Sequence, residues 1–169
     1  GSSVCETFEL KRASLLLLST LKQLKNKKVN HVAIPYELGL FFEGINKLLH
    51  YFLATKSKNR DYLWWDKANC LKEDFRKRTF FNLGGRETKI TFSKLERFLE
   101  NLILKLNKGI NKAKDSKSKL HRTYFTFSVT KYSSKKKHLV PAKFVKKALP
   151  LYLEAPIHAL RVEGSKSIY

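Results

Sequence analysis

The chain has 169 residues, of which 43% are hydrophobic, and its 35 Lys and Arg against 14 Asp and Glu give a formal net charge of +21. The apolar content is typical of a globular protein and excludes a disordered basic tail. No apolar run approaches the ~18 residues of a membrane-spanning helix, and two cysteines are too few for a disulfide framework. We expect an intracellular protein, nuclear or cytoplasmic, with no membrane association, no metal and no cofactor.

The first residues, Gly1-Ser2-Ser3, resemble the remnant of a cloning tag, and the chain contains no methionine. We therefore expect residues 1–3 to be a tag remnant and residues 4–169 to be one basic helical domain from a longer protein. In this interpretation residues 4–107 form a helical core, and residues 108–150 form a basic loop, hairpin and helix.

Three helices are predicted in the first half of the chain. Residues 7–25 have apolar side chains at helical spacing, and a polar break follows to Asn30. Pro35 suits the first turn of a second helix. A third helix is expected to begin at Asn59 or Asp61 and to end before the turn at residues 82–85. The apolar stripe of the first helix is expected to consist of Leu10, Ala13, Leu17, Leu21 and Leu24.

A fourth helix is predicted from Ser93, because Ser93 and Glu96 have the spacing of a capping box. Leucine and phenylalanine then recur at helical spacing as far as Leu106, and Gly109 is expected to end the helix. Residues 110–120 are mostly Lys, Asn, Ser and Asp, so we expect a solvated loop there.

Residues 123–132 alternate hydrophobic and hydroxyl side chains and predict a β-strand. A basic loop is expected at residues 133–138, and Leu139-Val140 could begin a returning strand. Pro141 is expected to open a short helix that ends at Pro150. The predicted fold class is therefore mainly α (α+β), a helical domain with a small basic β-hairpin. The order of these elements is that of a winged-helix-like module in which the hairpin loop is the wing. A plain helical bundle with one hairpin explains the same order almost as well.

Positive charge is concentrated in residues 105–147, which hold 14 of the 35 Lys and Arg but a single acid, Asp115. Packing like charges together costs free energy that a polyanionic partner would remove. The sequence therefore predicts contacts with nucleic-acid phosphates. The residues expected to make them are Lys112, Lys114, Lys117, Lys119, Arg122, Lys131, Lys135, Lys136, Lys137, Lys143, Lys146 and Lys147.

Two tyrosines of the predicted strand, Tyr124 and Tyr132, are candidates for stacking on bases, although rim packing explains them as well. Arg122 is the only arginine in the basic segment and is the candidate for a base or paired contact. Lys135-Lys136-Lys137 also fits a nuclear-localisation signal, and the other lysines fit a solvated surface.

Two short stretches resemble the geminin-binding winged helix of eukaryotic replication-licensing factors. They are Ile34-Pro35-Tyr36-Glu37-Leu38, followed by Phe41-Phe42, and residues 86–95. The spacing between the stretches is longer here and the following residues do not align, so the resemblance does not identify the family. It suggests replication as one setting for the chain.

No catalytic motif is apparent in the sequence. Asp74 with Glu87 and Lys89 has the spacing of metal-dependent nucleases, but Glu87 follows a Gly-Gly turn and no Pro-Asp precedes it. The histidines are scattered without ligand spacing. We expect a non-catalytic module that binds DNA or RNA, with DNA favoured by the winged-helix analogy alone. The alternative is a protein-interaction domain of a replication or other nucleoprotein assembly that docks on an acidic partner.

Overall fold

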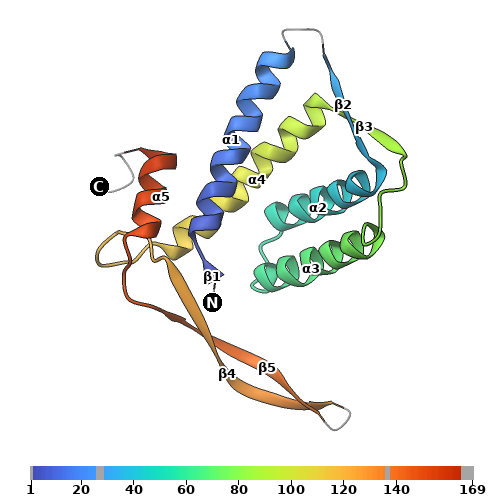
Figure 1. Cartoon of the computed structure of the whole chain (residues 1–169). Helices are drawn as coiled ribbons and strands as arrows, with labels where there is room; N and C mark the ends of the chain where they lie inside the picture. Colours follow the sequence, from blue (N-terminus) through green and yellow to red (C-terminus); the bar gives the residue numbers. More distant parts are fainter. Residues whose placement is uncertain (1, 26–28, 136–137, 165–169) are drawn as a thin grey trace. The chain divides into compact units, whose positions relative to one another are not determined.

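The structure is a computed structural model, and we describe residues 2–25, 29–135 and 138–164 (Figure 1). It confirms a mixed helix-and-sheet protein: within these residues there are five helices, a three-stranded sheet and a two-stranded sheet. The chain divides into two compact units, unit 1 (Gly1–Ala13 and Leu106–Tyr169) and unit 2 (Ser14–Lys105). We describe each unit by itself. The single domain expected from the sequence stays a prediction.

Two long helices, α1 (Cys5–Lys25) and α4 (Phe92–Ala113), contribute residues to both units. No helix among the described residues is long and apolar enough to cross a membrane. The other elements of unit 2 are β2 (His31–Pro35), α2 (Tyr36–Ala54), α3 (Arg60–Arg78) and β3 (Glu87–Thr91).

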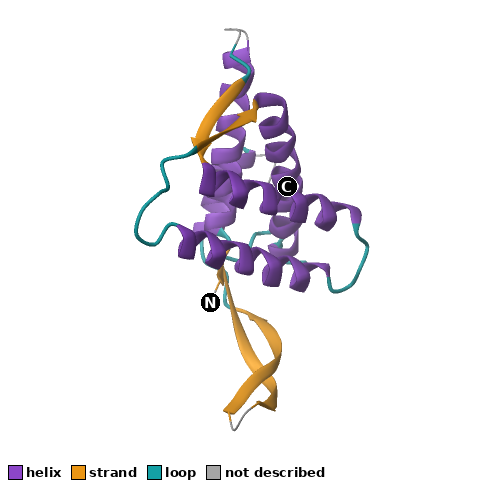
Figure 2. Ribbon diagram, turned by 90° about the vertical axis from the view of Figure 1, so that its right-hand side faces the viewer, coloured by secondary structure: helices purple, strands orange, loops and turns teal. Residues whose placement is uncertain are grey.

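Helices α2 and α3 lie side by side in both views (Figures 1 and 2). Pro35 is the N-cap residue of α2 and the last residue of β2, one position before the first turn in which the sequence places it. Stacked rings of Phe41 and Phe75, with centroids 5.2 Å apart, join the two helices. Phe41 of α2 thus packs on α3, whereas the neighbouring Phe42 packs on Phe98 of α4.

The predicted apolar stripe of α1 is wrong over its first half. Leu10 and Leu17 are about half exposed, whereas Phe8 and Leu21 are buried. The inward face also carries Lys11, which lies 2.6 Å from Glu163 and is itself buried. A lysine can be buried when it is paired with an acid, so the buried face of α1 is not the face with the most leucines. The leucine spacing alone therefore predicts the wrong face.

The two-stranded sheet of unit 2 is absent from the sequence prediction. β2 pairs antiparallel with β3, and Val32 lies opposite the buried Ile90. Strand β3 runs straight into α4, so the capping box predicted at Ser93 is wrong. Instead, Thr91 accepts the hydrogen bond from the Lys94 amide through its side-chain oxygen. Short strands with exposed side chains lack the alternation that a sequence pattern detects.

Unit 1 is built around a small core in which the start of α1 meets the end of α4. Its other elements are β1 (Ser2–Ser3), β4 (Tyr124–Lys135), β5 (His138–Ala148) and α5 (Glu154–Glu163). The expected helix end at Gly109 is wrong, because α4 continues to Ala113 and buries Ile110 against Phe8. Burial of the Ile110 side chain stabilises this last turn of the helix by more free energy than the helical Gly109 costs.

The predicted helix after Pro141 is also wrong, because these residues form β5. Strand β5 pairs with β4 from Phe125↔Ala148 out to Lys135↔His138. The order β1-β4-β5 completes the three-stranded sheet. Cross-strand pairing with β4 outweighs the helical spacing of the apolar residues after Pro141. Pro141 is tolerated because each strand of a two-stranded ribbon has one edge without hydrogen-bonded neighbours. Figure 2 shows the ribbon as a twisted pair of strands.

Candidate nucleic-acid interface

The ribbon formed by β4 and β5, residues 124–148, is a basic arm. It contains seven lysines and no Asp or Glu. Figure 1 shows it as two long strands that extend away from α5. Lys131, Lys143, Lys146 and Lys147 are all exposed on it. Lys136 and Lys137 lie outside the described residues, and of Lys135 only the backbone is described, as the end of β4.

The strand register distributes the lysines over both faces of the arm. Thr126 lies opposite Lys147 and Phe127 opposite Lys146, so these two lysines point to opposite faces. Farther out, Lys131 lies opposite Lys143 beside irregularities in the register. Directly opposed like charges destabilise a sheet. Lys131 and Lys143 therefore form a pair of like charges that faces solvent on the arm.

Lys114, Lys117 and Lys119 lie on a hydrogen-bonded turn that follows α4, where the sequence predicts a solvated loop. The Asp115 backbone N–H donates to the Leu120 carbonyl at 2.8 Å, and Arg122 N–H donates to the Ala113 carbonyl at 2.9 Å. A hydrogen bond from the Ser118 backbone N–H, followed by the Arg122 guanidinium, holds the pKa of Asp115 well below its usual range. These lysines are exposed on an ordered frame. Lys112, also predicted to contact phosphate, is exposed in the last turn of α4.

Arg122 makes paired contacts inside the protein. Its guanidinium donates to Asp115 Oδ1 at 2.6 Å and to the Leu149 carbonyl at 2.9 Å. It thus ties the basic turn to the segment that follows β5, and its side chain is 27% exposed. A contact between Arg122 and a base stays a prediction.

The two predicted stacking residues differ in their surroundings. Tyr124 donates its hydroxyl to Glu154 Oε2 at 2.6 Å, and its ring meets Tyr152 edge to face. The Glu154 hydrogen bond, followed by burial, raises the pKa of Tyr124 to about 12. Tyr132 lies farther out on the arm and is 55% exposed. Tyr132 therefore has a more accessible ring than Tyr124, and stacking by either stays a prediction.

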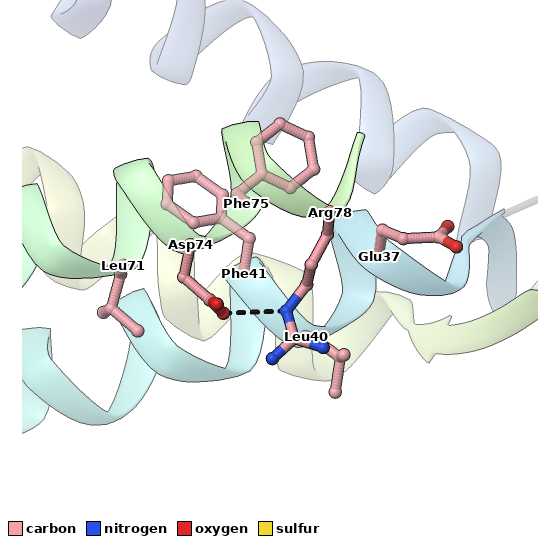
Figure 3. Close-up of a pocket in the computed structure, with 7 residues that line it drawn as sticks. All are labelled: Glu37, Leu40, Phe41, Leu71, Asp74, Phe75 and Arg78. Atoms are coloured by element: carbon pink, nitrogen blue, oxygen red, sulfur yellow. Dashed lines mark hydrogen bonds and ion pairs between the residues drawn. The ribbon is translucent and has the colours of Figure 1, made fainter. Parts of the chain in front are cut away.

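The acids with nuclease-like spacing do not converge on a metal site. Asp74 receives a 2.8 Å hydrogen bond from Arg78 and lines a pocket of about 30 Å³, which has room for roughly one water (Figure 3). Glu87 and Lys89 are exposed on β3. Among the described residues, no group of three or more His, Cys, Asp or Glu could hold a metal ion. That the protein is not an enzyme stays a prediction.

Unit 2 exposes aromatic side chains on and after α3. Of the adjacent tryptophans, Trp64 packs against Phe52, with ring centroids 5.7 Å apart, whereas Trp65 is 62% exposed. Phe80 and Phe81, in the loop after α3, are 75% and 91% exposed. Exposed aromatic groups of this size are typical of contact surfaces.

Comparison of the sequence with models of protein families and with curated proteins found no match. The assignment of function therefore depends on the chemistry of the residues themselves.

Proposed function

We propose that the protein is a non-catalytic nucleic-acid-binding module that grips the phosphate backbone with its basic arm and the neighbouring lysine turn. The observation that supports this most directly is the acid-free arm, which exposes lysines on both faces. DNA is slightly favoured over RNA by the analogy with winged-helix modules.

The chemistry of the arm fits phosphate better than a neutral partner. Each lysine that contacts a phosphate releases condensed counterions, which favours binding at low salt. Lysine is a point charge without the fork that lets arginine read a base edge. Binding should therefore depend weakly on nucleotide sequence. The proposed footprint comprises Lys112, Lys114, Lys117 and Lys119 with the lysines of the arm.

Fluorescence anisotropy with duplex DNA, single-stranded DNA and RNA over a salt series tests the proposal. The variant changes Lys143, Lys146 and Lys147 to Gln. The matched control changes Lys47, Lys67 and Lys89, which are exposed in unit 2, to Gln. Each lost phosphate contact lowers the slope of log affinity against log salt by about 0.9 on a duplex and about 0.7 on a single strand.

We expect the arm variant to lower the slope by one to three such steps, depending on how many of the three lysines meet phosphate. The control should lower affinity less at every salt concentration, although its charge change is identical. Absence of binding by the unmodified protein at low salt would refute the proposal. Equal losses in both variants would show that net charge, and not the arm, drives binding.

The exposed aromatic residues of unit 2 favour a second candidate, docking on an acidic protein partner. Trp65 and Tyr62 are each more than 60% exposed on α3. An aromatic interface tolerates salt, whereas phosphate binding weakens steeply with it. The same salt series applied to a captured protein partner separates the two functions.

A further inference from the structure

One face of the basic arm carries two aromatic rings that the unit 1 core does not cover. Strand pairing places Phe127 opposite Lys146 and Val129 opposite Phe144. Residues opposite each other, and those two positions apart, point to the same face. Phe127 and Phe144 are therefore diagonal neighbours, a separation of about 7–8 Å within reach of aromatic side chains.

Both rings are open to solvent, unlike the next phenylalanine on the same face. Phe127 is 52% exposed and Phe144 is 54% exposed, whereas Phe125 is 8% exposed. The ammonium group of Lys146 lies 4.3 Å from the centre of the Phe125 ring. The face thus begins in the core at Phe125 and continues outward as two open rings beside a lysine.

The charge of the arm identifies the kind of molecule that fits these rings. Seven lysines without an acid repel a second copy of the arm and repel basic protein surfaces. A nucleic acid brings phosphates for the lysines and flat bases for the rings. In a duplex the base faces are already stacked on each other, so only unpaired bases can lie on a protein ring.

We propose that Phe127 and Phe144 form a stacking surface for unpaired bases of single-stranded nucleic acid. This inference rests on the proposed nucleic-acid function and adds that the nucleic acid is single-stranded. Stacking works on any base, so it keeps the weak sequence dependence expected from the lysines. The sequence does not reveal these two residues as neighbours, because it assigns Phe144 to the helix expected after Pro141 and Phe127 to the strand at residues 123–132.

The test compares Phe127→Leu/Phe144→Leu with the unmodified protein. Leucine keeps an apolar side chain on the strand but has no aromatic face. The control is Val145→Ala, since Val145 is also 52% exposed but lies on the opposite face. The ligands are oligo(dT), oligo(U) and a blunt-ended duplex of equal length, measured by anisotropy, with thermal melting to confirm that each variant folds.

The loss expected for each ring is about 5- to 150-fold in affinity for the single strands, from the ~1–3 kcal/mol of one base on an aromatic side chain. Affinity for the duplex and all salt slopes should stay unchanged. A 2-aminopurine base placed within the oligonucleotide should lose fluorescence on binding to the unmodified protein and less on binding to the variant.

Three results would overturn the inference. They are an unchanged affinity of the leucine variant for single strands, an equal loss on duplex and single strand, and a concentration-dependent self-association that the leucine variant abolishes. If the unmodified protein binds no nucleic acid at low salt, the proposed function itself fails. If it binds with a steep salt slope and the leucine substitutions leave its affinity for single strands unaltered, only the stacking inference fails.

Discussion

A buried hydroxyl at the root of the arm should make a measurable contribution to the stability of unit 1. Thr123, directly before β4, is fully buried. Its Oγ1 donates to the Tyr152 carbonyl and accepts from the Ala155 N–H, both at 3.2 Å. Leu153, at the N-cap position of α5, makes no side-chain cap. Thr123 therefore supplies the cap of α5 from a distant part of the chain.

The substitution Thr123→Val keeps the shape of the side chain and removes only the hydroxyl. Two hydrogen bonds contribute about 0.5–1.5 kcal/mol each, so we expect a loss of about 1–3 kcal/mol in the free energy of unfolding. For a protein of this size that is roughly 2–12 °C in melting temperature. Urea unfolding followed by circular dichroism measures the free energy, and amide hydrogen exchange at Ala155 measures the cap.

Thr123→Ser is the matched control, because it keeps the hydroxyl and removes a methyl group. Both variants should be less stable than the unmodified protein, but only the valine variant should lose protection at the Ala155 amide. Nucleic-acid affinity below the melting temperature should be unchanged in both, since the arm lysines are untouched. A valine variant as stable as the unmodified protein, with Ala155 still protected, would show that Thr123 does not cap α5.

Three further predictions follow from buried or bonded groups. Burial lowers the pKa of His121 below 6.5, so as the pH drops the unfolded chain binds a proton before the folded protein does. The free energy of unfolding, measured by urea titration, should therefore fall as the pH drops from 6.5, and it should fall less in His121→Phe. Spectrophotometric titration should place the Tyr124 pKa near 12, and Glu154→Gln should lower it; an unchanged pKa would exclude the hydrogen bond as its cause. A side chain on Gly39 would overlap the methyl group of Thr88, so Gly39→Ala should lower the free energy of unfolding in urea by about 1–3 kcal/mol. Adding Thr88→Ala should recover most of that loss; no recovery would show that the overlap with Thr88 is not its cause.

The helices with long apolar patterns could be predicted from the sequence, whereas their ends could not. Helices α2 and α3 lie where Pro35 and Asn59 indicate. The start of α4 depends on β3, which pairs with a strand more than 50 residues away, and such pairing leaves no local signal. The end of α4 depends on burial of Ile110 against α1, which outweighs Gly109.

The basic character of the candidate site could be predicted because charge is a property of composition, but its geometry could not. The helical spacing of Phe144 and Val145 after Pro141 equally allows a strand, and only pairing with β4 decides between them. The hydrogen bond between Arg122 and Asp115 could not be predicted from the sequence either, because it depends on a turn that backbone hydrogen bonds close.

The arm also has to remain a two-stranded ribbon. Beyond the two residues that β1 covers, β4 has an open backbone edge, and β5 has another along its outer side. Open edges recruit strands from other chains and lead to aggregation. Exposed lysines, Pro141 and the register shifts around Lys131 are features that discourage such pairing. The residues proposed to grip phosphate thus also keep the ribbon from growing into a larger sheet. High ionic strength, which in the proposed function would release the nucleic acid, also screens the lysine charges and so weakens that protection.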